Sequence, residues 1–360
     1  MSTTTPPTET VAIGTLEDQK TGFFRGLLKA QAFQILLILI AIVLVFSALA
    51  PDSFAQWSNF RLIIQNASIL AVLGVGMTYI IITSGIDLSI GSVLVFSGVV
   101  SALTMRALGG EGWGVATIGI LVSILSGVCW GLLNGFLIAK AKIAPLIVTL
   151  GSLGMALGLA QILTGGVDIR DVPTVLTVSI GYGNVFGSLP IISVIALVVV
   201  VIGAVVLHFT KFGLYTYAVG SSELAARRVG VKVDRHLISV YTLSGALAGL
   251  AGILALSQFS TTAIAGQSQT NLNVIAAVVI GGTSLFGGVG TIFGTVVGLF
   301  IPAVLQNGFV ITGVQPFWQQ VAVGAVLITA VYVDQVRRTA ATRGTSQGLW
   351  RKFLSGGRRG

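Results

Sequence analysis

The chain has 360 residues, of which 54% are hydrophobic and 9% are charged, and it carries a net charge of +9. Its mean hydropathy is +0.97. A soluble domain has about 25% charged residues, so this composition excludes a soluble globular protein. A bilayer core takes about 20 apolar residues per helix, and the expected fold is therefore an all-α polytopic membrane protein with about ten transmembrane helices.

Apolar runs separated by glycine, proline or charge define the candidate spans. They are 32–50, 62–83, 88–105, 114–139, 144–164, 190–209, 237–257, 272–287, 290–311 and 317–334. The first run begins too late and is too long for an ordinary signal peptide, so we expect a retained span. The run 272–287 is short and glycine-rich, which predicts either a broken crossing or a re-entrant segment. The transmembrane domain then covers 32–335, between an N-terminal tail, 1–31, and a basic C-terminal tail, 336–360.

Lysine and arginine are distributed asymmetrically over the expected loops. With the N-terminus inside, ten spans place seventeen of the twenty basic residues on the cytoplasmic side and leave Arg61, Arg106 and Arg170 outside. Because such residues concentrate in cytoplasmic loops, both termini and the loop 210–236 are expected in the cytoplasm, with 165–189 as the largest outer loop. The positive charge then needs no nucleic-acid partner.

Two similar segments suggest an internal repeat. The sequence NGFLIAKAKIAP at 134–145 is echoed by NGFVITGVQP at 307–316. In the ten-span arrangement they lie at opposite faces, as an inverted repeat of spans 2–5 and 7–10 requires. Chance similarity between two glycine-rich membrane segments is the alternative.

A short charged stretch, AVGSSELAARRVG, lies in the middle of the long cytoplasmic loop. Ser222 is expected to cap a helix of about two turns, and Gly230 is expected to close it in the left-handed conformation. Glu223 favours the positive end of the helix dipole, whereas Arg227 and Arg228 favour the negative end. So short a helix is marginal in water, so we expect it to form only when a cytoplasmic protein holds it. A solvated loop or an amphipathic helix on anionic lipid is the alternative.

Six segments between about residues 57 and 335, several of them long, are distinctive. They are VGMTYIIITSGIDLSIGS, GLLNGFLIAKAKIAPLIVTLGSLGM, FGLYTYAVGSSELAARRVGVKVDR, SGALAGLAGIL, NVIAAVVIGGTSLFGGVGTIFGT and PFWQQ. In composition and order they resemble the permease subunit of ribose-type monosaccharide ABC importers. The resemblance implies a bacterial inner-membrane homodimer that works with a cytoplasmic ATPase with two nucleotide-binding halves and with a periplasmic sugar-binding protein. It also implies a coupling element inserted into the ATPase, which we expect at Gly220, Ser221, Ser222, Glu223, Leu224, Ala225, Ala226, Arg227, Arg228 and Gly230.

The sequence carries no catalytic or nucleotide-binding motif. It lacks G-x-x-x-x-G-K-[ST], so ATP and magnesium are expected on the partner ATPase and not on this chain. It also lacks H-E-x-x-H, a nucleophile elbow and a cluster of metal-ligating side chains, so we expect neither an enzyme nor a metal site. The single cysteine, Cys129, excludes an intramolecular disulfide.

Polar residues near the membrane interior are the candidates for a sugar pathway. Asp87 is the one acid there, and with Gly85, Ser89 and Gly91 it predicts a broken helix start whose backbone amides it caps. Lining the pathway is its alternative role, since sugar hydroxyls need polar partners along a wet pore. The candidate pathway residues are Asp87, Ser89, Asn134, Gln258, Asn273, Ser284 and Asn307.

Other classes of function remain as alternatives. An ion-coupled secondary transporter usually needs ionisable relays in its spans, and Asp87 is the sole candidate. A permease for branched-chain amino acids or nucleosides is the nearer alternative, although no interior arginine or lysine is available to meet a substrate carboxylate. The sequence leaves ribose, fructose, xylose and galactose all open as the sugar.

Overall fold

The computed structural model describes most of the chain. The described residues are 31–265, 270–315, 317, 318, 320–325, 328, 329, 331, 332 and 335. Apart from Gln31, the expected N-terminal tail lies outside them, and so does the expected C-terminal tail. Within 317–335, every described residue is helical.

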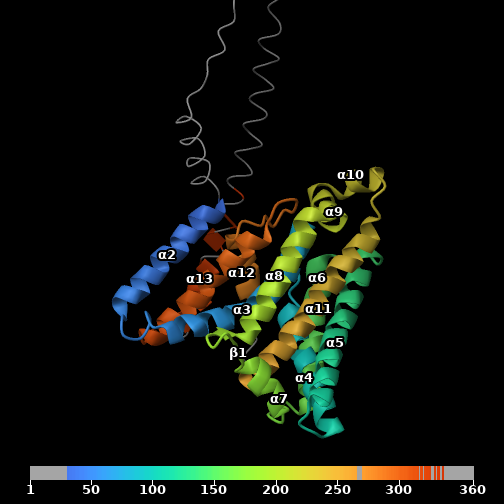
Figure 1. Cartoon of the computed structure of the whole chain (residues 1–360). Helices are drawn as coiled ribbons and strands as arrows, with labels where there is room; N and C mark the ends of the chain where they lie inside the picture. Colours follow the sequence, from blue (N-terminus) through green and yellow to red (C-terminus); the bar gives the residue numbers. More distant parts are fainter. Residues whose placement is uncertain are drawn as a thin grey trace, which may run out of the picture.

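The described chain is almost entirely helical (Figure 1). Its elements are α2 (Gln31–Leu49), α3 (Trp57–Ile82), α4 (Ile90–Leu108), α5 (Trp113–Ala139), α6 (Pro145–Thr164), α7 (Thr174–Leu176), η1 (Thr177–Gly181), β1 (Asn184–Val185), β2 (Leu189–Pro190), α8 (Ile191–Phe209), α9 (Lys211–Ser221), α10 (Glu223–Arg228), α11 (Val233–Phe259), α12 (Thr270–Ile280) and α13 (Ile292–Ile311). Strands β1 and β2 form one short antiparallel hairpin.

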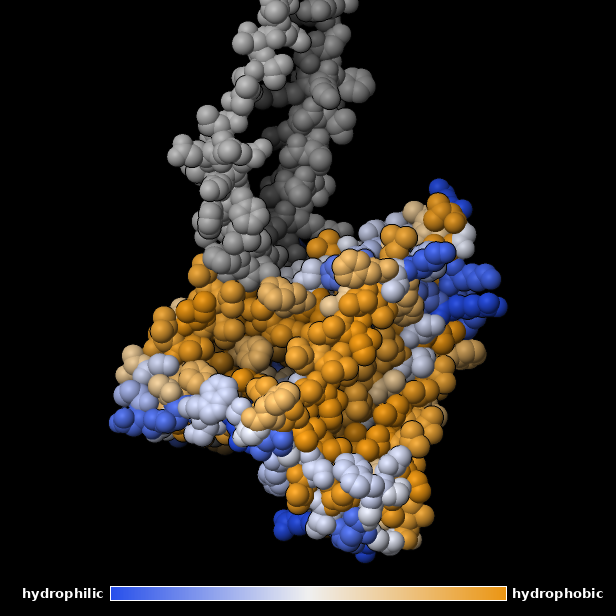
Figure 2. All heavy atoms as spheres, in the orientation of Figure 1, coloured by the Kyte–Doolittle hydropathy of each residue, from blue (hydrophilic) through white to orange (hydrophobic). Residues whose placement is uncertain are grey.

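Seven of the described helices are long and apolar enough to cross a membrane. They are α3, α4, α5, α6, α8, α11 and α13. The apolar stretch Gln34–Leu49 of α2 and the whole of α12 are shorter. Figure 2 shows the apolar surface as a broad band, with hydrophilic residues gathered at the ends of the helices. The expected class, an all-α polytopic membrane protein, is confirmed.

The weak span 272–287 consists of most of the short helix α12 followed by a non-helical segment. Helix α12 ends at Ile280, where two glycines follow, and Gly282 has a φ of +93°. Eleven residues rise about 16 Å, roughly half of the bilayer core. The chain nevertheless crosses the molecule here, because Thr262 and Gly288 lie at opposite faces, as the contacts below show. The segment is therefore a broken crossing and not a re-entrant one.

Glycines let α5 and α11 approach closely at the centre of the fold. Gly127 and Gly131 of α5 face Gly245 and Tyr241 of α11, and a Cβ at either α5 position would overlap the facing backbone. Small residues spaced four apart are the usual means by which membrane helices pack backbone against backbone. Helix α11 also packs on α3 and α4, so it lies at the core of the described bundle.

The helix contacts come in corresponding pairs. Helix α11 packs on α5 and α4, as α3 packs on α13 and α12, and α4 packs on α5 as α12 packs on α13. This is the pattern that results when α3, α4 and α5 correspond to α11, α12 and α13. It supports the inverted repeat that the two NGF segments suggest.

Contacts between loops define two opposite faces of the molecule. On the face with α10, Ser84 bonds to Gly220, Lys142 pairs with Asp234, and Gly288 bonds to Ile82. We call this the α10 face. On the opposite face, Glu111 bonds to Thr174, Ile169 to Thr262 and Arg61 to Asn184. This alternation of loops is the one that the ten-span arrangement predicts.

Candidate functional site

Helix α10 forms where the sequence predicts it. The Ser222 Oγ accepts a hydrogen bond from the Ala225 backbone N–H at 3.2 Å, and Ser222 has extended backbone angles. At the other end Gly230 has a φ of +87°, a conformation that favours glycine, and its N–H donates to the Arg227 carbonyl oxygen at 3.1 Å. The expected N-cap and the expected left-handed terminus are both confirmed.

The expectation that a partner protein alone holds this helix is wrong. Ala226 is only 3% exposed and packs in a small apolar cluster with Val219 of α9 and Val233 of α11. The rest of the chain thus stabilises one face of α10, which compensates for its short length. The two alanines of α10 differ, because Ala226 points inward while Ala225 is exposed.

An apolar, basic surface remains on the outer side of α10. Leu224 is 62% exposed and Val229 is 79% exposed, and both flank exposed Ala225 and Arg228. We call these four residues the coupling surface, after the role that the resemblance implies for this stretch. Large apolar side chains held out at the tip of a charged helix are typical of a protein-binding site.

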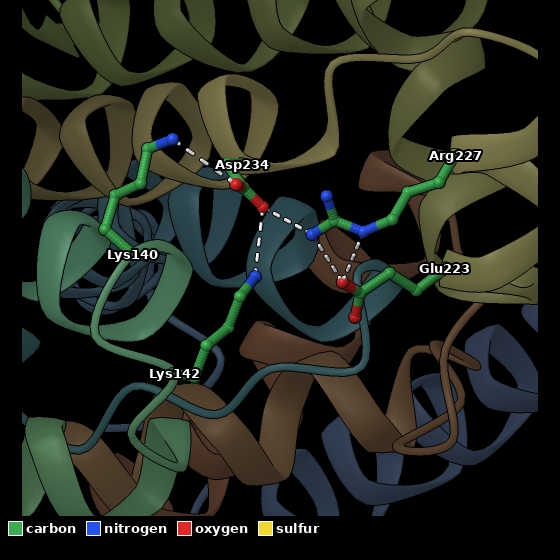
Figure 3. Close-up of polar contacts among 5 residues, drawn as sticks. All are labelled: Lys140, Lys142, Glu223, Arg227 and Asp234. Carbon is green, nitrogen blue, oxygen red and sulfur yellow. Dashed lines mark hydrogen bonds and ion pairs between the residues drawn. The ribbon is translucent and has the colours of Figure 1, made fainter.

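Five charged residues join α10 to two other elements (Figure 3). The Arg227 guanidinium bonds to the Glu223 carboxylate, with its Nη2 at 2.8 Å, and also pairs with Asp234. Asp234 in turn accepts from Lys142 Nζ at 3.0 Å and from Lys140 Nζ at 3.4 Å. We call these five residues the ion-pair cluster. It ties α10 to the first turn of α11 and to the loop between α5 and α6.

The cluster surrounds one carboxylate with three cations. The side chain of Asp234 is 23% exposed, against 51% for Lys140 and 58% for Lys142. Single exposed ion pairs contribute at most about 1 kcal/mol, so the cluster matters less for global stability than for where it holds α10. Sequence reasoning treated Lys140 and Lys142 only as markers of sidedness and did not single out Asp234.

The end of α9 is clamped onto two non-helical segments. Gly220 lies so close to Ile82 and Gly288 that a Cβ there would overlap the Ile82 carbonyl oxygen. The Gly288 N–H donates to that same oxygen at 2.9 Å, and Ser84 Oγ donates to the carbonyl oxygens of Gly220 at 3.3 Å and Phe286 at 3.0 Å. The expected coupling residue Gly220 therefore anchors the element and Ser221 packs beside Gly288, while the coupling surface projects from it.

Polar residues form a buried chain beneath this face. Asp87 Oδ1 accepts from the backbone N–H of Ser89 at 2.8 Å and from its Oγ at 2.6 Å. Asn134 Nδ2 donates to Ser89 Oγ at 3.0 Å, and Ser152 Oγ donates to Asn134 Oδ1 at 2.5 Å. None of these four residues, which we call the buried polar chain, is more than 3% exposed. The buried polar chain connects the start of α4 with α5 and α6.

The buried polar chain brings together three of the seven candidate pathway residues. Asp87, Ser89 and Asn134 meet, and the local bonds of Asp87 support the capping role expected for it. Next to them, Asn271 Oδ1 accepts from the Gly91 N–H at 2.6 Å, so the starts of α12 and α4 also meet. Sequence reasoning missed Ser152, a serine within an apolar run, and Asn271, just before one, because neither position gives any sign of its distant partner.

Two further candidates lie in separate clusters. Gln258 Nε2 donates to Asn66 Oδ1 at 2.7 Å, which joins α11 to α3. Asn307 Nδ2 donates to Asn59 Oδ1 at 2.8 Å, near the end of α13 away from the α10 face. Neither contacts the buried polar chain.

The last two candidates are half-buried. Asn273 lies on α12 and Ser284 lies in the return between α12 and α13. The Ser284 N–H donates to the Val289 carbonyl oxygen at 3.0 Å, which closes that return. Ser284 therefore belongs with the loops of the α10 face.

The loop 165–189 is folded against its neighbours at the opposite face. Asp168 Oδ1 accepts from Ile264 N–H at 2.8 Å and from Thr262 Oγ1 at 3.1 Å. Glu111 accepts from the backbone N–H of Thr174 at 2.5 Å and from its hydroxyl at 2.9 Å. These two hydrogen bonds lower the pKa of the Glu111 carboxyl.

Comparison with known proteins gives a consistent family. Residues 59–331 match a family model described as branched-chain amino acid transport system, permease component. The chain is 35% identical over 318 residues to the ribose import permease RbsC of Escherichia coli K12, covering 87% of this chain and 95% of that protein. RbsC of Bacillus subtilis 168 is 37% identical, with 88% and 96% covered, and the fructose import permease FrcC of Rhizobium meliloti is 33% identical, with 85% and 86% covered. The chain belongs to the ribose-type ABC import permease family.

As a member of this permease family, the chain is a transport subunit of a multi-pass membrane system. The family match confirms the resemblance seen in the six sequence segments. It begins at residue 59, within the first turn of α3, so α2 lies outside the part matched by the family model. No solved structure matches the chain.

Proposed function

We propose that this permease imports a monosaccharide across the bacterial inner membrane. A separate ATPase with two nucleotide-binding halves drives it and binds the ATP and magnesium, and a periplasmic binding protein delivers the sugar. The names of the similar proteins, two ribose import permeases and one fructose import permease, support the choice of a sugar.

The observation that carries the proposal is the construction of α10. The coupling surface projects from a helix that the chain itself braces, through Ala226 on one side and the ion-pair cluster on the other. A force applied to α10 by an ATPase would therefore reach the loop between α5 and α6 through Asp234. Asn134 of α5 and Ser152 of α6 belong to the buried polar chain, so that force would act on the elements that hold it.

The distribution of charge supports a cytoplasmic position for the α10 face. The described basic residues of this face are Lys140, Lys142, Lys211, Arg227, Arg228, Lys232 and Arg235, against Arg61, Arg106 and Arg170 at the other. Positive residues favour the cytoplasmic side, so we place both termini there too. The loop 165–189 then faces the periplasm and is our choice for contact with the binding protein.

We propose that a second copy of the permease covers α6. This helix exposes Ile147 at 65% and Ile162 at 76%, and the described residues leave open space beside its glycines Gly151, Gly154 and Gly158. Glycines spaced three and four apart on one face allow close helix packing in membranes. The opposite face of α6 carries Ser152 of the buried polar chain. The helix would thus separate the second copy from that chain.

A permease for branched-chain amino acids is the second candidate, and the description of the matching family model favours it. Among the described acidic, basic and histidine residues, however, those that are buried are Asp87 and His236. No described lysine or arginine is buried. An amino-acid carboxylate would find no buried cationic partner in that part of the chain.

Reconstitution tests the proposal. The permease, its ATPase and its binding protein are placed in liposomes, and uptake of radiolabelled ribose, fructose and leucine is measured with and without ATP. We expect uptake of a sugar that needs ATP and all three components. Uptake of leucine alone would favour the second candidate, and sugar uptake driven by an ion gradient without the ATPase would contradict the proposal.

A further inference from the structure

An apolar cavity opens between α3, α8 and α13. Its volume is about 270 Å³, and its walls include Ile64 and Ala71 of α3, Val200 of α8, and Leu299 and Phe300 of α13. In Figure 2 the surface between the positions of α8 and α13 is hollowed and coloured as hydrophobic. Because these residues lie in the middle parts of their helices, the cavity lies at the level of the hydrocarbon core.

The few polar groups of the cavity are already satisfied. Ser68 Oγ donates to the Ile64 carbonyl oxygen at 2.6 Å and lies 3.0 Å from Ser193 Oγ. The lining carries no charged residue. A site of this kind offers nothing to a sugar or to water, since apolar cavities of about 150 Å³ already stay dry and take up apolar molecules. Its occupant must therefore be a hydrocarbon.

A cation, Arg61, lies nearer the membrane surface than the cavity, on the same face of α3. Arg61, Ile64, Ser68 and Ala71 are spaced at i, i+3, i+7 and i+10, so they form one stripe along the helix. Arg61 is in the first turns of α3, about 15 Å along the axis from Ala71. Trp57, the first residue of that helix, is 57% exposed, as is typical of the membrane interface.

The Arg61 guanidinium is available to an anion. It contacts the amide oxygen of Asn184, next to the start of α8. The ion pairs among the described residues do not include Arg61. An arginine at the interface that lacks a carboxylate partner binds phosphate readily, because its planar donors match phosphate oxygens.

We infer that α3, α8 and α13 bind one anionic phospholipid, with its phosphate on Arg61 and an acyl chain in the cavity. The lipid belongs to the leaflet opposite the α10 face. Such a lipid accounts for both observations at once. Its phosphate supplies an anion for Arg61 at the interface, and its acyl chain supplies hydrocarbon for the cavity about 15 Å deeper. Bound there, it bridges the α3–α8 pair to α13 and so stabilises the bundle against separation of these helices. This inference does not depend on which solute the permease carries.

Native mass spectrometry of the full chain in detergent tests the inference. Delipidated protein is titrated with phosphatidylglycerol and with phosphatidylcholine, and the first bound lipid is quantified. We expect one tight site that prefers phosphatidylglycerol about fivefold, the size expected for one interfacial arginine. Arg61→Gln should abolish that preference, whereas Arg106→Gln, which changes an exposed arginine of the same face, should keep it.

Two cavity-filling variants test the acyl-chain site separately. Ala71→Phe on α3 and Val200→Phe on α8 should each lower binding of both lipids at least severalfold, and size-exclusion chromatography identifies which variant is folded. Unchanged lipid binding in a folded cavity-filling variant would overturn the inference, as would a preference that survives Arg61→Gln. Loss of dimer with unchanged lipid binding would also overturn it, because the cavity would then receive a second copy and not a lipid.

Discussion

Asp234 Oδ1 lies 3.0 Å from Lys142 Nζ, and this pair joins the first turn of α11 to the loop between α5 and α6. Arg227 of α10 contacts the same carboxylate, so three elements meet at one side chain. The contact gives a short exposed helix a fixed position relative to the long helices behind it. The proposed coupling of ATP hydrolysis to transport depends on that position.

Asp234→Asn should uncouple transport from ATP hydrolysis. The amide keeps the size of the side chain but leaves Arg227, Lys140 and Lys142 without their shared anion. We expect a stability loss below about 1 kcal/mol, since exposed pairs contribute little, together with a several-fold fall in sugar transported per ATP. Transport and ATPase assays in proteoliposomes measure this ratio. Lys211→Gln, a charge change on the same face outside the cluster, is the control, and an unchanged ratio in Asp234→Asn would contradict the role of the cluster.

Gly220→Ala should disrupt the seat of α9. The added methyl group overlaps the Ile82 carbonyl oxygen, so α9 must move away from the end of α3. We expect a loss of roughly 1–3 kcal/mol, as for other overpacked sites, seen as a lower unfolding temperature in detergent. Gly114→Ala, a helical glycine with open space around its Cβ position, is the matched control and should leave that temperature unchanged or higher. Equal behaviour of the two variants would show that α9 is not seated as described.

Leu224→Asp should remove ATPase binding without unfolding the permease. Leu224 is exposed and makes part of the coupling surface, so a charge there costs the free permease little. Ala226→Asp should behave differently, because it buries a charge beside Val219 and Val233 and so displaces α10. Copurification of the ATPase, together with the unfolding temperature, separates the two effects. If Leu224→Asp retains the ATPase while Arg228→Gln weakens only contact with anionic lipid, α10 lies on the membrane surface instead.

Acidification should loosen the loop 165–189 at Glu111. The hydrogen bonds from Thr174 lower the pKa of Glu111 in the folded chain, so the carboxylate stabilises the fold above its ordinary pKa, about 4.3. That contribution is lost as the pH falls through the lower folded pKa. Hydrogen exchange of the Thr174 amide, measured from neutral pH down to about pH 2, well below the ordinary glutamate pKa, should rise relative to its intrinsic rate at the acid end. In Glu111→Gln the relative exchange should be fast throughout, and an identical pH profile in both proteins would exclude this contact.

The sequence predicts most of the helices because each depends on local signals. The cap at Ser222 and the left-handed Gly230 are determined within nine residues, and both appear as predicted. The run 272–287 is predicted as broken or re-entrant for the same kind of reason, because its glycines are local signals, and α12 does end at Ile280, just before two of them.

The site was less predictable because its partners are distant in sequence. Lys142 and Asp234 are 92 positions apart, and nothing in either local stretch specifies the other. The burial of Ala226 was also not predictable. Ala225 and Ala226 are adjacent and identical, so the sequence does not show which of the two is buried. Packing of α9, α10 and α11 decides it, and that packing is a property of the whole fold.

Site-directed photo-crosslinking from Leu224 tests the coupling role of α10 most directly. A benzophenone is attached to Leu224→Cys in a Cys129→Ala background, in membranes that contain the permease, its ATPase and its binding protein. A matched probe at Phe186→Cys, which is 93% exposed on the opposite face, reports the other side of the membrane. We predict a crosslink from position 224 to the ATPase and none to the ATPase from position 186. Crosslinks from position 224 to lipid or to the binding protein alone would contradict the assignment of α10 as the element that couples this permease to ATP hydrolysis.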